Sequence, residues 1–294
     1  MKKSLLFILG ILFFINSYGQ LSGTKSIPGD YASVSSAITD LNGQGVGVGG
    51  VIFNIAADYV ESITTQLSIT ATGIAGSEIV FQKDPATTGA NPKITRTDAG
   101  ATSVTTLGYL SDAIIRLDGT DYITFDGIDI ASNNSGIDYG YMTFKTATNG
   151  CQYVTIKNCS IAMTKGTSGV VTGIYISNGP TSTSATGVTV TSSAGINNYI
   201  TIIGNNISNV HAGIVARGSS ATNFGDNNLV IGQSGAGNTI TNYGGGNASA
   251  TYGVYMIYQQ SSNVSYNTIN NAFGGSNHAS TLYGIFNSTL GTGG

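Results

Sequence analysis

The sequence predicts an all-β solenoid in which short strands stack in successive coils, and its composition and an internal repeat are the observations that predict it. Glycine accounts for 42 of the 294 residues, about twice its usual share, which excludes a helical bundle. Charged residues make up only 9% of the chain, whereas 40% of the residues are hydrophobic. A chain of this composition is not disordered by charge repulsion. We therefore expect a folded chain that is rich in β-strands.

The internal repeat consists of two motifs that alternate along the chain. The first motif reads Tyr-Ile/Val-Thr and ends in isoleucine about every thirty residues, with one longer interval. Its clear copies are Tyr122–Ile130, Tyr153–Ile161 and Tyr199–Ile207, and weaker copies end at Ile240 and Ile269. The second motif begins with glycine and follows each first motif, at residues 140–142, 173–176, 213–216, 253–256 and 284–286. Two different strands therefore recur in a fixed order.

Within the first motif, apolar and polar residues alternate with the period of a strand. Ile123 and Phe125 fall on one face, and Val154 and Ile156 occupy the same places in the next copy. One copy carries too few apolar residues to form a core by itself. Stacking of successive copies in register places like side chains about 4.8 Å apart and builds a continuous core.

This pattern resembles the right-handed parallel β-helix repeat of the pectate-lyase-like families, closely over residues 105–290 and more loosely over 27–104. The resemblance implies three short strands per coil, with a sharp bend two residues before the last isoleucine of the first motif. The bend positions include Asn205, Asn238 and Asn267, which we expect to form a structural ladder of stacked, hydrogen-bonded amides. Ile128 and Cys159 occupy the bends of the earlier coils and depart from that ladder.

The N-terminal region has a different organisation. Residues 1–19 have the positive start and apolar run of a signal peptide, so the protein is expected to be secreted or held on the outer cell surface. Residues 20–50 form an N-terminal segment in which 33–41 read as a capping helix that begins at Ser33. Residues 51–294 are expected to form the β-helix, truncated at its C-terminal end. No later stretch is long and apolar enough to span a membrane. The opening also resembles type IX secretion cargo, whose sorting domain lies at the far C-terminus.

Residues that could carry out chemistry are sparse. In the resembled lyases and hydrolases the catalytic groups stand on the outer face of the strand that corresponds to the glycine-first motif here. The outer positions of those motifs carry no carboxylate and one basic residue, Arg217. Four aspartates lie between residues 118 and 129 and make Ca²⁺ the only cofactor to consider. We expect their side chains to diverge, so no metal site is predicted. His211 and His278 each lack a neighbouring ligand in the sequence. We predict no catalytic residue.

The two cysteines, Cys151 and Cys159, are predicted to remain unpaired. A roughly straight strand segment separates them by more than a disulfide can bridge. The net charge of −3 offers no basic field, so nucleic acid is excluded as a partner.

Two aromatic stripes remain as candidate binding residues. Tyr122, Tyr153 and Tyr199 are expected on the outer face of the first motif, and Tyr175, Tyr255 and Phe286 on the outer face of the second. Aromatic rings beside hydroxyl and amide groups can hold a sugar by stacking and hydrogen bonding, although tyrosine also suits any pleated surface.

The sequence therefore favours a secreted or surface β-helical scaffold, non-catalytic in this segment, that acts as an adhesin-like or glycan-contacting part of a larger protein. The expected partner is an extracellular polysaccharide, with the chain monomeric or part of a longer one. The alternative is a polysaccharide lyase or glycoside hydrolase of the pectate-lyase-like class.

Overall fold

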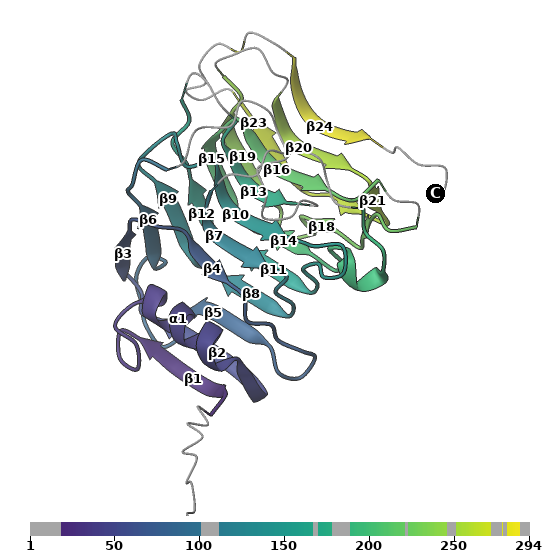
Figure 1. Cartoon of the computed structure of the whole chain (residues 1–294). Helices are drawn as coiled ribbons and strands as arrows, with labels where there is room; N and C mark the ends of the chain where they lie inside the picture. Colours follow the sequence, from purple (N-terminus) through teal and green to yellow (C-terminus); the bar gives the residue numbers. More distant parts are fainter. Residues whose placement is uncertain are drawn as a thin grey trace, which may run out of the picture.

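The chain winds into a parallel β-helix in which every coil after the first contributes one strand to each of three sheets (Figure 1). The computed structural model describes residues 19–100, 112–166, 170–177, 189–220, 223–245, 251–271, 278 and 281–288. The signal-peptide pattern falls on residues 1–19 and lies, apart from Gly19, outside the described residues. The paired strands of the three sheets are all parallel. The architecture is therefore the solenoid that the repeat predicted.

Sheet A is formed by the Tyr-Ile-Thr strands of the first motif and by their equivalents in earlier and later coils. Its strands, in stacking order, are β1 (Leu21–Ile27), β2 (Val46–Ile55), β5 (Ile79–Lys83), β8 (Ile123–Asp126), β11 (Val154–Lys157), β14 (Thr201–Ile203), β18 (Val230–Ile231) and β22 (Asn263–Val264).

Sheet B follows the bend and carries the last isoleucine of the first motif. Its strands, in stacking order, are β3 (Val60–Ile63), β6 (Lys93–Arg96), β9 (Asp129–Ser132), β12 (Ser160–Ala162), β15 (Asn206–Val210), β19 (Thr239–Tyr243) and β23 (Thr268–Asn270).

Sheet C completes the coil and contains the glycine-first motifs. Its strands, in stacking order, are β4 (Leu67–Ile69), β7 (Ala113–Asp118), β10 (Tyr139–Phe144), β13 (Thr172–Ile176), β16 (Ala212–Arg217), β20 (Thr251–Ile257) and β24 (Leu282–Ser288). The short pair β17 (Asp226–Asn227) and β21 (Gln259–Gln260) and the 3₁₀ turn η1 (Ser193–Gly195) lie between sheets C and A.

The core is a set of apolar columns, because each strand places the same kind of residue inward at the same height of the coil. Ile130, Ile161, Ile207, Ile240 and Ile269 pair in series along sheet B. In sheet A, Phe53 stacks on Phe81 with ring centroids 4.5 Å apart, and Phe81 stacks on Phe125 at 5.5 Å. Almost all of these side chains are fully buried, so stacked coils provide the core that one coil lacks.

The glycines of the second motif face this core and leave room for the sheet B isoleucines. A Cβ atom at Gly213 would lie 2.5 Å from the carbonyl oxygen of Gly253 and 2.7 Å from Cγ2 of Ile240. Gly140, Gly173 and Gly253 show the same two close approaches, to the next glycine carbonyl and to the neighbouring isoleucine. The repeated glycine is therefore required by space, since any side chain there would push two coils apart.

The asparagines at the bend between sheets A and B form a continuous hydrogen-bonded ladder. Oδ1 of Asn238 accepts from the backbone N–H and from the side-chain amide of Asn205, both at 3.0 Å. Oδ1 of Asn267 accepts from Asn238 in the same way at 3.0 and 2.9 Å. Oδ1 of Asn205 accepts from the backbone of Cys159, which occupies the bend of the preceding coil. The ladder thus satisfies bend N–H groups that the coil would otherwise bury without partners.

The helix α1 (Val34–Gln44) replaces sheets B and C in the first coil and covers the core there (Figure 1). Ser33 caps the helix by accepting from the backbone of Ser36 at 3.0 Å, as predicted. The carboxylate of Glu61 in β3 accepts from the backbone of Val34 at 2.7 Å, and Asn42 bonds the carbonyl of Ser68 in β4 at 2.8 Å. The helix therefore satisfies polar groups of the strands that it covers.

The N-terminal strands differ in detail from the sequence-based expectation. β1 was not predicted; it lies inside residues 20–50 and pairs with β2, so sheet A begins before residue 51. A corner separates β3 from β4. No helix among the described residues is long and apolar enough to cross a membrane.

A buried ion pair joins coils that lie far apart in sequence. Nζ of Lys145 lies 2.5 Å from Oδ1 of Asp226, and the two side chains are 0% and 1% exposed. Asn197 donates its backbone N–H to Oδ1 of Asp226 at 2.9 Å and its amide to Oδ2 at 3.1 Å. The carboxylate is therefore fully engaged, and the pair serves to hold these segments together.

Candidate functional site

The outer corner where the chain enters sheet A carries a stack of three tyrosines. The rings of Tyr122 and Tyr153 have centroids 4.3 Å apart, and those of Tyr153 and Tyr199 are 4.7 Å apart, each pair within 14° of parallel. All three residues have left-handed backbones, with φ of 51°, 55° and 54°. The equivalent residue of the next coil, Asn228, has φ 55°. The corner therefore fixes one backbone shape and holds the rings in register.

This stack changes how the tyrosines can meet a sugar. Tyr153 has both ring faces covered by its neighbours, so the expected stacking of a sugar on an open ring face does not apply to it. Tyr153 and Tyr199 are nevertheless 39% and 44% exposed. The solvent-facing groups of Tyr153 are therefore its ring edge and phenol hydroxyl, and the three rings form a row along the solenoid axis.

A row of threonines runs parallel to the tyrosine stack on the same outer face of sheet A. Thr124, Thr155 and Thr201 pair directly in the β8, β11 and β14 ladder, and each is partly exposed. These are the same three coils that carry the tyrosines. The face thus presents two parallel rows of hydroxyl groups that repeat with the coil spacing.

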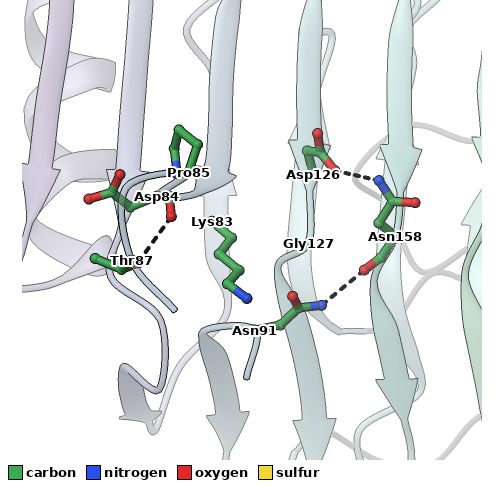
Figure 2. A pocket seen from close by; sticks show the side chains of 8 residues that line it. All are labelled: Lys83, Asp84, Pro85, Thr87, Asn91, Asp126, Gly127 and Asn158. Atoms are coloured by element: carbon green, nitrogen blue, oxygen red, sulfur yellow. Dashed lines mark hydrogen bonds between the residues drawn. The ribbon is translucent and has the colours of Figure 1, made fainter. Parts of the chain in front are cut away.

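A polar hollow lies at the C-terminal ends of the sheet A strands β5, β8 and β11, where the chain turns toward sheet B (Figure 2). It has a volume of about 340 Å³ and is lined by Lys83, Asp84, Pro85, Thr87, Asn91, Asp126, Gly127 and Asn158. Asn158 donates to Oδ1 of Asp126 at 2.7 Å, and Asn91 donates to the carbonyl of Asn158 at 3.0 Å. Lys83 extends into this region and donates to the carbonyl of Gly89 at 2.5 Å. The hollow offers amide, carboxylate and ammonium groups within one strand length of the hydroxyl rows.

The second aromatic stripe is divided by burial. Tyr175 was expected on the surface, but it is 0% exposed and stacks on Tyr139 at 4.8 Å within an outer apolar cluster of sheet C. Burial raises the pKa of Tyr175 to about 12 in spite of the nearby charge of Arg217. Tyr175 is therefore not available for surface binding. The alternation of the sequence places its side chain on the outer face of the strand but does not show what covers that face.

The other two residues of that stripe belong to a larger aromatic group. Tyr255 stacks on Phe286 at 5.5 Å, and Tyr252 stacks on Tyr283 at 5.1 Å, with all four partly exposed. Tyr252 also lies 4.6 Å from Tyr255. The sequence analysis missed Tyr252 and Tyr283, although the repeated Tyr-Gly-x-aromatic pattern at 252–255 and 283–286 could have indicated them.

Sheet C carries one outer carboxylate that the sequence analysis did not place there. Asp118 in β7 pairs in register with Phe144, and Arg116 with Met142, so both charged residues face outward. Nε of Arg116 lies 2.8 Å from Asp118, and the guanidinium lies 4.7 Å from the centre of the Phe144 ring. Each charge is therefore held by its neighbour. β7 escaped detection because Ile114 stands where later coils have glycine.

The remaining aspartates of the acidic stretch bind different groups. Asp121 accepts from the backbone of Gln152 at 2.7 Å, and Asp129 accepts from the backbone of Ser160 at 2.7 Å. Asp126 pairs with Lys157 at 3.0 Å. The described part of the chain holds no group of three or more histidine, cysteine or acidic side chains placed to bind a metal.

The two histidines, read separately in the sequence, lie in one polar cluster at the corner between sheets B and C. Nδ1 of His211 accepts from Val171 at 2.9 Å, and Nε2 faces the carbonyl of Gly166. Burial, reinforced by the charges of Lys165 and His278, lowers the pKa of His211 to about 4. Both ring nitrogens of His211 are therefore used by the backbone, and the ring stays neutral at pH 7.

Lys165 completes this cluster and is held by neutral groups. Its Nζ donates to the carbonyls of Asn242 and Gly244 at 2.8 and 2.6 Å and to Oδ1 of Asn242 at 3.0 Å. Burial lowers the pKa of Lys165 to about 8. Stacking of loops from separate coils brings these residues together, so no local sequence signal indicates the cluster.

Both cysteines are buried free thiols, Cys151 near the corner of sheets C and A and Cys159 at the bend. Burial raises the pKa of each thiol to about 12. Neither thiol is therefore a reactive nucleophile in the folded chain.

The class of protein that this geometry defines is a parallel β-helix with a polar and aromatic outer face. No family model matches the chain, and no curated protein matches it. Among solved structures, it is similar to the alginate lyase from Paenibacillus sp. str. FPU-7, with 14% sequence identity and a TM-score of 0.25 over 90% of this chain and 99% of that chain. A similarity of this size identifies neither a family nor an activity. The assignment of the fold rests on the strand pairing.

Proposed function

We propose that the chain is a secreted or surface-held scaffold whose outer face of sheet A contacts an extracellular polysaccharide without turning it over. The observation that carries this proposal is the register of the tyrosine stack with the threonine row over the same three coils. The face is exposed and uncharged along these rows, so it suits a hydroxylated rather than an ionic ligand.

The argument from chemistry is one of matched repeats. A polysaccharide is a linear polymer whose hydroxyl groups recur at each sugar unit. Phenol and threonine hydroxyls both donate and accept hydrogen bonds, and here they recur at each coil, about 4.8 Å apart. The exposed ring edges of Tyr153 and Tyr199 add apolar contact. Many weak contacts of this kind give binding along the polymer rather than recognition of one sugar.

The absence of turnover is proposed from what holds the charged side chains. On the outer faces that the structure describes, Asp118 is bound by Arg116, and Asp126 by Lys157. Hydrolysis or elimination requires an acid and a base that are free to exchange protons with the substrate. The export pattern of residues 1–19 supports placement outside the cell, and type IX secretion is the route that we propose from the resemblance.

The test is binding to a panel of soluble and insoluble polysaccharides, with Tyr153→Asn as the variant. Asparagine is tolerated at this corner, because Asn228 occupies the equivalent place with the same φ. The matched control is Tyr266→Asn, since Tyr266 is 70% exposed with φ 58° but lies at the bend between sheets A and B.

We expect Tyr153→Asn to weaken binding about tenfold, which corresponds to about 1.4 kcal/mol, and Tyr266→Asn to leave it unchanged. Equal effects of the two variants, or no binding to any polysaccharide, would contradict the proposal. Turnover of polyuronates that is lost on chelation of Ca²⁺ would show instead the alternative, a polysaccharide lyase.

A further inference from the structure

We propose that the tyrosine stack is a site of oxidative cross-linking, at which a carbon–carbon bond between Tyr153 and Tyr122 or Tyr199 joins successive coils. The inference is independent of polysaccharide binding. It rests on the placement of the three rings, on their exposure, and on a second tyrosine pair of equal geometry that is buried.

The rings are stacked face to face along the solenoid axis. Tyr122 and Tyr153 are 4.3 Å apart and within 14° of parallel, and their backbones differ by only a few degrees in φ. The rings therefore lie face to face, which brings the carbons ortho to each hydroxyl close to the next ring. Phenoxyl radicals join through these ortho carbons, and the new bond forms between ring faces, where the unpaired electrons are concentrated.

Exposure decides whether this geometry can react. Tyr153 and Tyr199 are 39% and 44% exposed, so an oxidant and water reach their hydroxyl groups. Tyr139 and Tyr175 stack with nearly the same geometry, 4.8 Å and 14°, but both are 0% exposed. Burial raises the pKa of both phenols, so loss of a proton on oxidation is disfavoured there. The buried pair is a comparison built into the same molecule.

The reaction balances with a peroxide as the oxidant. A haem peroxidase with hydrogen peroxide removes one electron and one proton from each of two phenols and gives two phenoxyl radicals. The radicals couple between ortho carbons, and each of these carbons then loses its hydrogen to restore the two phenols. Overall two hydrogen atoms leave the protein, and one hydrogen peroxide becomes two molecules of water.

The product would supply a covalent link between coils that the cysteines cannot supply, because both thiols are buried and unpaired. The bond would close a loop between neighbouring coils and restrict their separation in the unfolded chain. Tyr153 lies between the other two rings, so it is the ring shared by both possible couplings.

The test treats the whole chain with a haem peroxidase and limiting hydrogen peroxide, then measures dityrosine fluorescence and maps the joined peptides by mass spectrometry. We expect a monomeric product lighter by two hydrogens, with Tyr153 joined mainly to Tyr122. Tyr153→Phe keeps the stack but cannot form the radical, and it should lower the yield of this product at least tenfold. Tyr175→Phe and Tyr252→Phe should leave the yield at the stack unchanged.

Three results would overturn the proposal. They are cross-links mainly between molecules, cross-links mainly at Tyr139–Tyr175 or Tyr252–Tyr283, and an unchanged yield at the stack in Tyr153→Phe. Circular dichroism before oxidation establishes that each variant is folded, so that a lower yield reports on the stack itself.

Discussion

Replacing Gly213 by alanine tests whether the glycine column sets the distance between coils. The new Cβ would lie 2.5 Å from the carbonyl oxygen of Gly253 and within 2.8 Å of two carbons of Ile240. The first of these contacts is with backbone, which cannot rotate away. Relief therefore requires that the coils separate or that β16 shifts against β20.

The magnitude follows from two opposing effects. Overfilling a packed core costs about 1–3 kcal/mol, and a backbone contact this short belongs at the upper end. Alanine also restricts the unfolded chain, which favours folding by about 0.4–1 kcal/mol where the native backbone accepts it. We expect a net loss of about 2 kcal/mol in the free energy of unfolding, measured by urea denaturation followed by circular dichroism.

Gly284 provides the matched control in the same column. A Cβ there meets nothing within 4 Å, and its φ is not in the left-handed region. Gly284→Ala should therefore be neutral or slightly stabilising. Substitutions at ordinary surface positions change the free energy of unfolding by up to about 0.5 kcal/mol. If the losses for Gly213→Ala and Gly284→Ala differ by less than this, the glycine column does not set the distance between coils.

Three further predictions concern polar groups. Asp226→Asn leaves the buried Lys145 without its counter-charge and should lower the free energy of unfolding by about 3–5 kcal/mol. Asp126→Asn should lower it by only about 0–1 kcal/mol, because Asp126 and its partner Lys157 are 29% and 35% exposed. Similar thermal shifts for the two variants would refute this prediction. Asn238→Ala leaves the backbone and amide donors of Asn205 without their acceptor and should lower the free energy of unfolding by about 2–4 kcal/mol. The control Asn206→Ala, at an exposed position, should lower it by less than about 0.5 kcal/mol. A similarly small loss for Asn238→Ala would mean that the ladder does not stabilise the fold. Folding lowers the pKa of His211 from 6.5 to about 4, so the contribution of the neutral ring to stability is complete above pH 6.5 and is lost as the pH falls through 4. His211→Asn keeps an acceptor for the backbone N–H of Val171 and should remove this part of the pH dependence. Identical pH profiles of the two proteins, measured by urea denaturation, would disprove the prediction.

The sequence alone allows the coil, the bend and the capping helix to be predicted, because each depends on local pattern. Alternation around Ile123 and Ile200 places one face inward, and the repeated asparagines mark the bend. β1 escapes this reasoning, since its residues do not alternate clearly and its place is decided by pairing with β2.

The candidate site is less predictable, because it depends on what packs over the outer faces. Tyr153 and Tyr175 occupy equivalent outward positions in their motifs, yet one is exposed and the other is buried. Lys165, His211 and His278 meet only because loops of different coils stack. Contacts between loops depend on loop conformation, for which spacing along the chain gives no signal.

The helix α1 also bears on the risk of fibrous aggregation that the end of a solenoid carries. Solenoid ends resemble the growing tips of amyloid, since each can template a further layer through unpaired backbone. At the first coil the helix occupies two of the three positions, so that at this end of the described solenoid β1 alone presents an edge to an incoming strand. That edge carries Lys25, whose charge opposes the docking of another strand. Removal of α1 would therefore be expected to expose a full three-sided template and to favour end-to-end polymerisation from this end of the solenoid.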